Sequence, residues 1–476
     1  MCRAPAIVLC LLLVPLAAEA FDSVNDPRRW AIADVNVIDV DSGEIARDQT
    51  IVIQNGFIDA VAPAASVDPD SLDLVVDGAG RYAVPGLWDM HVHLRGGPAL
   101  IEANEHWLPQ YLGFGITTVR DAGGDLPDSV LHWKAEVAQG FLEGPRIYSA
   151  LRKIDGVVGA QSGSIPVASQ ADIDSALDYL SLAGADFVKV YDDSLPRDLY
   201  VLTVREAEAR RMKTAAHVPP WVPFAELVDA GLDSVEHSIY LAEAADPENR
   251  RLAEAGSPEE MTDYVEYYVA IREAGGRADP ATFRNAIAGM RQNGTAVVST
   301  LGIEHQILAH LDGLPAANPR REQTPAPILA THEATLTFLT SLPDEMAENQ
   351  RIIVRQTETL LKAAADAGVT ILAGTDTGAD NALLYPGDSL HRELAALVAI
   401  GISPLEALRS ATIYPARWMN LFPIFGSITP GAAADIDILD SSPLEDIANT
   451  RSLSAVIQQG VYYDAAELKQ LKTLEP

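Results

Sequence analysis

The chain has 476 residues, and its 67 acidic side chains outnumber its 34 basic ones, giving a formal net charge of -33 at pH 7. Hydrophobic residues make up 48% and charged residues 21%, which is typical of a folded globular protein, and the length allows about three domains. A surface this negative repels phosphate backbones and anionic lipid headgroups, so nucleic-acid and membrane-surface partners are poor interpretations. It attracts cations, as a metal-dependent enzyme requires, but solubility or salt adaptation explains the acidity equally well.

Residues 1–20 have the pattern of a secretory signal peptide. Arg3 gives a positive start, residues 6–17 form an apolar run, and the small residues Ala18 and Ala20 mark a cleavage site after Ala20. The run is too short to span a membrane, and no later apolar stretch is long enough. We therefore expect a periplasmic or secreted protein without membrane insertion.

Both cysteines, Cys2 and Cys10, lie inside this leader. The residues before Cys10 lack the small side chain of a lipoprotein cleavage site, so lipidation is not expected. The mature chain would then have no disulfide, no thiolate ligand and no cysteine nucleophile. Any metal would be bound through nitrogen and oxygen atoms.

Two segments near opposite ends of the chain share one pattern. Residues 51–59 read IVIQNGFID and residues 455–463 read AVIQQGVYY. Each is an apolar run, a polar residue with glycine, and a second apolar run, which predicts a β-hairpin. Residues 33–40 and 434–440 alternate with strand period beside them.

These patterns predict one small β-sandwich formed from both chain ends, residues 21–83 and 416–476. A larger domain, residues 84–415, would be inserted between them, which proteins tolerate because chain termini often lie close together.

Within the larger domain, short apolar strands alternate with helical stretches such as 170–183, 198–211 and 351–367. The candidate strands are residues 82–90, 115–121, 145–150, 185–191, 213–218, 234–239, 295–301 and 369–375. Eight strand–helix units in a row predict an α/β fold of the (β/α)8 TIM-barrel type.

Two connections in this domain are unusually long, residues 241–294 and 303–350. Connections at that rim of a barrel tend to shape or cover the active site. Helical decoration used for packing or for homo-oligomer contacts is the alternative and stays open.

Polar side chains collect at the carboxyl ends of the predicted strands. His91 and His93 end the first strand, His217 the fifth, His237 the sixth and Asp376 the eighth. Residues two apart in an extended segment point the same way, so His91 and His93 can bind one cation. Neutral imidazoles and a carboxylate are ligands that Zn²⁺ and similar divalent ions accept.

Lys189 lies inside the apolar strand 185–191. A lysine in such a strand either pairs with an acid or takes part in chemistry as the neutral amine, because burial disfavours the ammonium form. Its position on the same rim as the histidines favours the chemical role.

This set of residues resembles the two-metal form of the amidohydrolase superfamily, and it is similar to the imidazolonepropionase-like group that includes metal-dependent Xaa-Pro dipeptidases. The stretches VPGLWDMHVHL at 84–94, GITTVRDAGG at 115–124, SLHRELAALVAIGISPLEALRSAT at 389–412 and GSITPGAAADIDIL at 426–439 add to the resemblance. The resemblance covers almost the whole chain after the leader and is weakest across the two long connections.

The resemblance implies two divalent ions, with Zn²⁺ expected. His91, His93 and Asp376 would bind the more buried ion, and His217 and His237 the more exposed one. Lys189 would carry a CO₂-derived carbamate that bridges both ions together with a hydroxide. The hydroxide would attack the substrate carbonyl, and Asp376 would pass its proton to the leaving amine.

Other residues are candidates of lower specificity. Tyr240 follows His237 closely and is placed to donate a hydrogen bond to a substrate carbonyl or oxyanion, with rim packing as the alternative. Arg152 and His305, after the third and seventh strands, are candidate substrate contacts. Asp121 is placed to orient a ligand or to cap a turn, and His391 to anchor a helix.

The leading interpretation is an exported metal-dependent amidohydrolase that cleaves an amide or peptide bond in a small dipeptide-like or N-acyl amino acid substrate. Residues 152–168 lack the glycine- and histidine-rich loop expected in a dipeptidase of this group. One alternative is a mononuclear cyclic amidohydrolase, imidazolonepropionase-like, or a deaminase, which would not need Lys189 as a bridge. A further alternative is a non-catalytic periplasmic binding protein.

Overall fold

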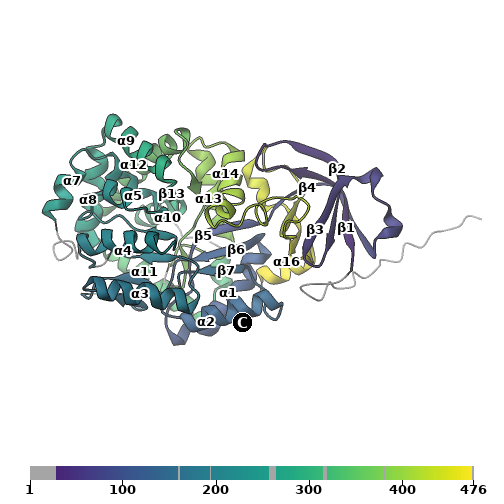
Figure 1. Ribbon diagram of the computed structural model, residues 1–476, viewed down its shortest axis with the longest axis horizontal. Coiled ribbons are helices and arrows are strands. Elements are labelled where there is room, and N and C mark those ends of the chain that lie inside the picture. Colours follow the sequence, from purple (N-terminus) through teal and green to yellow (C-terminus); the bar gives the residue numbers. More distant parts are fainter. Residues whose placement is uncertain are drawn as a thin grey trace, which may run out of the picture.

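The computed structural model describes residues 28–158, 161–192, 194–256, 264–314, 319–379 and 381–473. The predicted signal peptide lies outside these residues, as do short parts of both long connections. A helical body and a smaller β domain lie side by side along the long axis of the molecule (Figure 1). Within the described ranges, no helix is both long and apolar enough to cross a bilayer.

Strands from both chain ends share one sheet, in which C-terminal and N-terminal segments lie together (Figure 1). Its strands are β1 (Trp30–Ile38), β2 (Ile45–Gln54), β3 (Phe57–Pro63), β4 (Leu74–Pro85), β16 (Ile436–Leu439), β17 (Leu453–Gln458) and β18 (Val461–Asp464), in the order β18-β17-β16-β4-β1-β2-β3. The antiparallel pair β4 and β16 joins the two ends. Trp30, Ile51, Ile436 and Ile457 belong to one buried cluster, so the two ends also share a hydrophobic core.

The two predicted hairpins form, and their turns touch. Asn55 and Gly56 connect β2 to β3, Gln459 and Gly460 connect β17 to β18, and all four residues have positive φ. Two-residue turns of this kind match the twist of the strands, and glycine adopts them without strain. A Cβ on Gly460 would lie 2.7 Å from the Cα of Gly56, so the contact requires glycine.

The remaining strands form two parallel sheets. One has the order β14-β13-β12-β11-β10-β8-β9 and the other β15-β5-β6-β7. The strands are β5 (Leu87–His93), β6 (Ile116–Asp121), β7 (Arg146–Ser149), β8 (Lys153–Asp155), β9 (Ser164–Pro166), β10 (Val188–Val190), β11 (Thr214–Ala216), β12 (Ser234–Glu236), β13 (Ala296–Val298), β14 (Ile371–Leu372) and β15 (Thr377–Gly378). The α/β class with parallel strands is therefore confirmed.

The third and eighth predicted strands are each interrupted. β7 pairs with β6 while β8 pairs with β10, and β14 pairs with β13 while β15 pairs with β5. Each interrupted strand thus connects the two sheets, an arrangement consistent with the predicted barrel.

Helices cover the parallel strands on the outside (Figure 1). They are α1 (Ile101–Gly113), α2 (Pro127–Gln139), α3 (Gln170–Ala183), α4 (Arg197–Ala209), α5 (Phe224–Asp229), α6 (Leu241–Ala245), α7 (Asn249–Ala255), α8 (Tyr264–Gly276), α9 (Pro280–Asn293), α10 (Leu301–Leu311), α11 (Ala326–Ser341), α12 (Glu345–Asp366), α13 (Asp388–Ala399), α14 (Pro404–Ser410), α15 (Ile413–Trp418) and α16 (Ala465–Lys472). The helices predicted at 170–183, 198–211 and 351–367 correspond to α3, α4 and α12.

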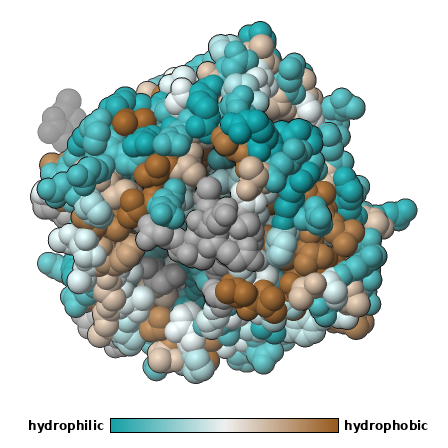
Figure 2. All heavy atoms as spheres, turned by 90° about the vertical axis from the view of Figure 1, so that its left-hand side faces the viewer, coloured by the Kyte–Doolittle hydropathy of each residue, from teal (hydrophilic) through white to brown (hydrophobic). Residues whose placement is uncertain are grey.

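The long connection 241–294 is helical where the structure describes it. It contains α6, α7, α8 and α9, and α8 packs against both α6 and α12. The face of the molecule that carries these helices is mostly hydrophilic, with separate hydrophobic patches (Figure 2). This surface agrees with the high content of acidic residues.

Candidate metal centre

His91 and His93 lie at the carboxyl end of β5, and Asp376 directly precedes β15, the strand that pairs with β5. Strand β5 directs both imidazoles to one side, and their ring centroids are 5.1 Å apart. The backbone N–H of Asp376 donates to the carbonyl of His91 at 2.7 Å, which fixes the carboxylate beside β5. Asp376 Oδ1 lies 3.5 Å from His91 Nε2 and 3.2 Å from His93 Nε2.

Gly374 permits this close approach. A Cβ at this position would lie 2.6 Å from Val298 Cγ1 and 2.9 Å from His91 Cβ. Only glycine therefore lets the chain pass between β5 and β13 two residues before Asp376.

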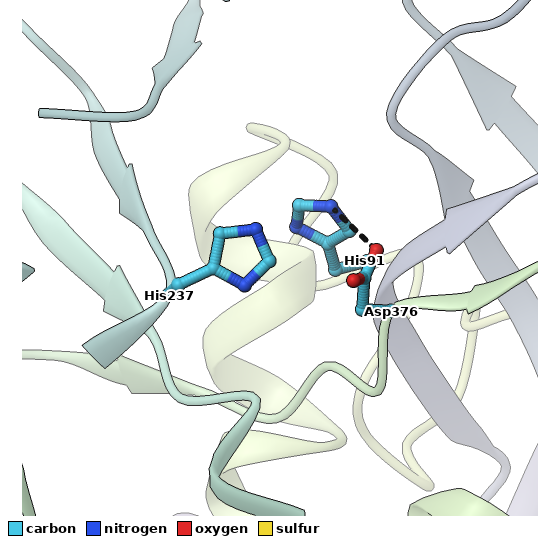
Figure 3. A group of neighbouring side chains, drawn as sticks. All are labelled: His91, His237 and Asp376. Atoms are coloured by element: carbon cyan, nitrogen blue, oxygen red, sulfur yellow. Dashed lines mark ion pairs between the residues drawn. The ribbon is translucent and has the colours of Figure 1, made fainter. Parts of the chain in front are cut away.

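His217 and His237 complete the group from strands β11 and β12. Their ring centroids are 4.9 Å apart, and that of His237 is 4.7 Å from that of His91. One ligand atom each of His91, His237 and Asp376 lies within 4.8 Å of the other two. Figure 3 shows His91 beside Asp376 and the His237 ring facing them from another strand.

Each of the four histidines uses Nδ1 for a hydrogen bond within the protein. His91 Nδ1 donates to Glu236 Oε2 at 2.5 Å, His93 Nδ1 to the carbonyl of Gly123 at 2.9 Å, and His217 Nδ1 to Asp192 Oδ1 at 2.6 Å. His237 Nδ1 lies 2.8 Å from the hydroxyl oxygen of Thr300. Carboxylates and carbonyls only accept, so in the first three rings the lone pair is on Nε2, as in metal-binding histidines.

These lone pairs lie close together. His91 Nε2 lies 3.3 Å from His93 Nε2, and both face the carboxylate of Asp376. Three acceptors this close repel one another unless a cation lies between them. The donor set therefore fits a divalent ion bound by nitrogen and oxygen.

Burial keeps the imidazoles neutral. It lowers the pKa of His91, His217 and His237, and it lowers the pKa of His93 to about 3. Neutral imidazole is the form that binds a metal ion.

Backbone strain concentrates at the same place. His237, Thr300 and Asp376 have φ of 71°, 41° and 63°, in the left-handed region that side chains with a Cβ rarely adopt. Such strain persists only where the surrounding structure imposes it, and it clusters at functional sites.

Lys189 lies on β10 among these groups and is fully buried. Its Nζ has no hydrogen-bond partner among the described residues. Burial lowers the pKa of Lys189 to about 8, although nearby Glu236 and Asp192 oppose the shift. This shift raises the neutral fraction of the amine near neutral pH above that of an exposed lysine. A buried nitrogen without a hydrogen-bond partner among the described residues is where an added polar group would be bound.

Glu236 and Arg120 form a buried ion pair that the sequence analysis did not identify. Arg120 Nη2 donates to both oxygens of Glu236, at 2.7 Å and 2.6 Å, and its guanidinium lies over the rings of Trp418 and Phe187. The second of these oxygens also accepts from His91. A charged residue inside an apolar strand, as in ITTVRD and DSVEH, was the available signal.

Asp192 was also missed, and it connects His217 to two tyrosines. Tyr240 is buried, and its ring centroid lies 5.6 Å from that of His217 and 6.3 Å from that of His237. The Tyr240 and Tyr267 hydroxyls donate to Asp192 Oδ2, at 3.1 Å and 2.6 Å. The structure thus places Tyr240 beside the imidazoles, and its role toward substrate stays a prediction.

The other candidates have partners within the protein. Arg152 donates from Nε and Nη2 to the carbonyls of Gly163 and Ser164, at 3.0 Å and 2.9 Å. His305 Nε2 lies 3.0 Å from Glu358 Oε1, which connects α10 to α12. These contacts join each side chain to a neighbouring segment of the protein. A role for Arg152 or His305 in binding substrate stays a prediction.

Asp121 and His391 have positioning contacts. Asp121 accepts from the backbone N–H of Leu94, directly after His93, and from the hydroxyl of Ser149. The His391 ring nitrogens lie 2.9 Å from the Thr450 hydroxyl and 2.9 Å from the carbonyl of Phe114, which anchors α13.

Comparison with known proteins shows what this chain is similar to. Residues 278–464 match the sequence profile of the amidohydrolase family. The imidazolonepropionase of Chromobacterium violaceum is 25% identical over 435 residues, covering 88% of this chain and 91% of that protein. The ochratoxinase of Aspergillus niger is 35% identical over 115 residues, only 21% of this chain and 22% of that protein.

A solved structure supports the same fold over nearly the full length. A Xaa-Pro dipeptidase with bound methionine has a TM-score of 0.66 at 19% identity, covering 92% of this chain and 100% of that one.

Proposed function

We propose that this chain is a member of the amidohydrolase superfamily and a metal-dependent hydrolase acting on carbon–nitrogen bonds, which the profile match over residues 278–464 and the likeness to an imidazolonepropionase support. In this proposal it cleaves an amide or peptide bond in a small dipeptide-like or N-acyl amino acid substrate. The observation that carries the proposal is the close approach of acceptor atoms from His91, His93 and Asp376. The lone buried amine of Lys189 beside them supports a second ion.

In this proposal His91, His93 and Asp376 would hold one divalent ion, and His217 and His237 would hold a second. Lys189, once carboxylated by CO₂, would supply a carboxylate ligand to both ions, and Zn²⁺ is the expected metal. When bound, the ions supply a hydroxide nucleophile near neutral pH and polarise the scissile carbonyl. We place these residues at the carboxyl ends of one (β/α)8 barrel.

The protein's own side chains would transfer protons and contact the substrate. Asp376 accepts the proton of the nucleophile and transfers it to the leaving amine, and Tyr240 donates a hydrogen bond to the substrate oxygen as charge develops there. Arg152 and His305 are the proposed contacts for the rest of the substrate.

A second candidate is a mononuclear hydrolase of cyclic amides. The 25% identity to an imidazolonepropionase over most of both chains favours it. Such a site would not need Lys189 as a bridge, so the number of bound ions separates the two candidates.

The test is the metal content of the protein purified without chelator and with bicarbonate. Two divalent ions per chain, with hydrolysis of dipeptides or N-acyl amino acids, would support the proposal. One ion would favour the mononuclear candidate, with cyclic amides or amines as substrates. No ion, even after addition of Zn²⁺, would favour a binding protein. Export is part of the proposal and is tested by locating the processed chain outside the cytoplasm.

A further inference from the structure

The long connection between the sixth and seventh strands sends one side chain into the metal centre. Tyr267 lies on α8, 75 positions after Asp192, and its hydroxyl donates to Asp192 Oδ2 at 2.6 Å. The same hydroxyl lies 2.7 Å from that of Tyr240. The other carboxylate oxygen of Asp192 accepts from His217.

The protons in this group can be assigned by counting. Two hydroxyl hydrogens serve three contacts, namely each tyrosine with Asp192 and the two tyrosines with each other. The contact of Tyr267 with the carboxylate is 2.6 Å, whereas that of Tyr240 is 3.1 Å. Tyr267 therefore donates to Asp192, and the Tyr240 proton is shared between the Tyr267 oxygen and the carboxylate.

This assignment of protons affects both Asp192 and Tyr240. Asp192 keeps a strong donor on Oδ2 even when Tyr240 turns away, so the carboxylate remains oriented toward His217 Nδ1. Tyr240 can then redirect its proton to a substrate oxygen without releasing Asp192. A hydrogen bond on the far nitrogen orients a metal-binding imidazole and sets its tautomer.

We propose that Tyr267 is a positioning residue that holds Asp192, and through it His217, so that the Tyr240 hydroxyl is available to the substrate. This rests on the proposed function for the role of His217 in metal binding and of Tyr240 toward substrate. The insertion thereby completes the more exposed half of the site.

The first experiment compares Tyr267→Phe with Tyr268→Phe. Tyr268 is the matched control because it is the next residue on α8 and successive helical side chains point about 100° apart. Binding of Zn²⁺ is measured by chelator competition, and the visible spectrum of the Co²⁺-loaded protein reports the ligand geometry. We expect Y267F to bind the second ion about tenfold more weakly and to alter the Co²⁺ spectrum, with the first ion unchanged. Y268F should match the wild type.

The kinetic part uses a double-mutant cycle with Asp192→Asn. Y267F should lower kcat about tenfold with KM changed by less than about twofold, since the substrate itself is not contacted. In the D192N background the same change should have little further effect, because Tyr267 acts through that carboxylate.

Several results would overturn the inference. Wild-type affinity for the second ion in Y267F, equal losses in Y267F and Y268F, or a full additional loss in the D192N background would each contradict it. So would a wild-type protein that binds only one ion. If the wild type cleaves no amide while Y267F still weakens the second ion, the proposed function fails and the positioning role stands.

Discussion

His91 and Glu236 are joined by a 2.5 Å hydrogen bond from Nδ1 to Oε2, although 145 positions separate them in the chain. Both side chains are fully buried. Glu236 also accepts from Arg120, so one carboxylate orients the imidazole and neutralises a buried guanidinium. This pair explains why Nε2 of His91 faces the metal centre.

Glu236→Gln should weaken both the metal site and the fold. The amide removes the negative charge that compensates Arg120, and breaking a buried pair in this way costs about 3–5 kcal/mol. Metal affinity should fall about 10–100-fold, because the partner that orients His91 is altered. Thermal unfolding and chelator competition measure the two effects.

The control is the double variant Arg120→Met with Glu236→Leu, which leaves neither charge unpaired. It should be less destabilised than E236Q, while its metal affinity stays low because His91 has lost its partner. A double variant less stable than E236Q would contradict the assignment of the loss to the unpaired charge.

Lys189→Ala separates the two-metal proposal from the mononuclear candidate. If Lys189 bridges two ions, the variant should lose the second ion and about 10²–10³-fold in activity, as after loss of one electrostatic stabiliser. Added acetate or formate should restore part of both, because a small carboxylate fits the space of the carbamate. Metal content and activity at increasing acetate concentration are the measurements. Wild-type metal content and activity in the variant would contradict a bridging role for Lys189.

The metal-free protein should lose stability as the pH falls, in part through His391. Burial lowers the pKa of His391 from 6.5 to about 3, so below pH 6.5 the unfolded chain binds a proton at this ring that the folded protein does not. The free energy of unfolding should therefore fall with decreasing pH between these values, by up to about 1.4 kcal/mol per pH unit for this group.

His391→Gln should make that pH dependence shallower, as measured by urea unfolding of the metal-free protein at about pH 7.5, 6.5 and 5.5. His132→Gln is the matched control, because the His132 side chain is 66% exposed. An equal change of slope in both variants would refute the role of burial at His391.

Gly460→Ala should destabilise the β domain more than Gly431→Ala. Both glycines have left-handed φ, of 80° and 88°, which costs a residue with a Cβ about 1–2 kcal/mol. At Gly460 the new Cβ would also collide with Gly56, whereas at Gly431 nothing lies within 4 Å. Urea unfolding of both variants checks the difference, and equal losses would show that the turn contact is unimportant.

Periodicity was sufficient to predict the parallel α/β domain and the two hairpins. Strand after strand carries an apolar run, and the carboxyl ends of parallel strands meet at one rim. Residues at those ends, such as His91, His217 and Asp376, could therefore be proposed together from their positions in the chain. The structure places ligand atoms of His91, His237 and Asp376 within 4.8 Å of one another, and the His217 ring lies 4.9 Å from that of His237.

The partners of these residues could not be predicted in the same way. Glu236 was visible as a charged residue in an apolar strand, but nothing in the sequence pairs it with His91 or Arg120. Asp192 was visible only as the residue after a strand. Tyr267 lies in a helix whose sequence gives no sign that it reaches the site. Their roles depend on distances between elements far apart in the chain, and no local pattern contains those distances.

By itself the sequence determined the elements, the alternation of strand and helix, and the chemical character of the strand ends. These follow from local preferences and from the period of apolar residues, which act over a few positions of the chain. The folded structure was needed to tell which nitrogen of His91, His93 and His217 faces the centre. That choice depends on a hydrogen bond to Glu236, Gly123 or Asp192, each brought to the ring by the packing of a different strand or loop.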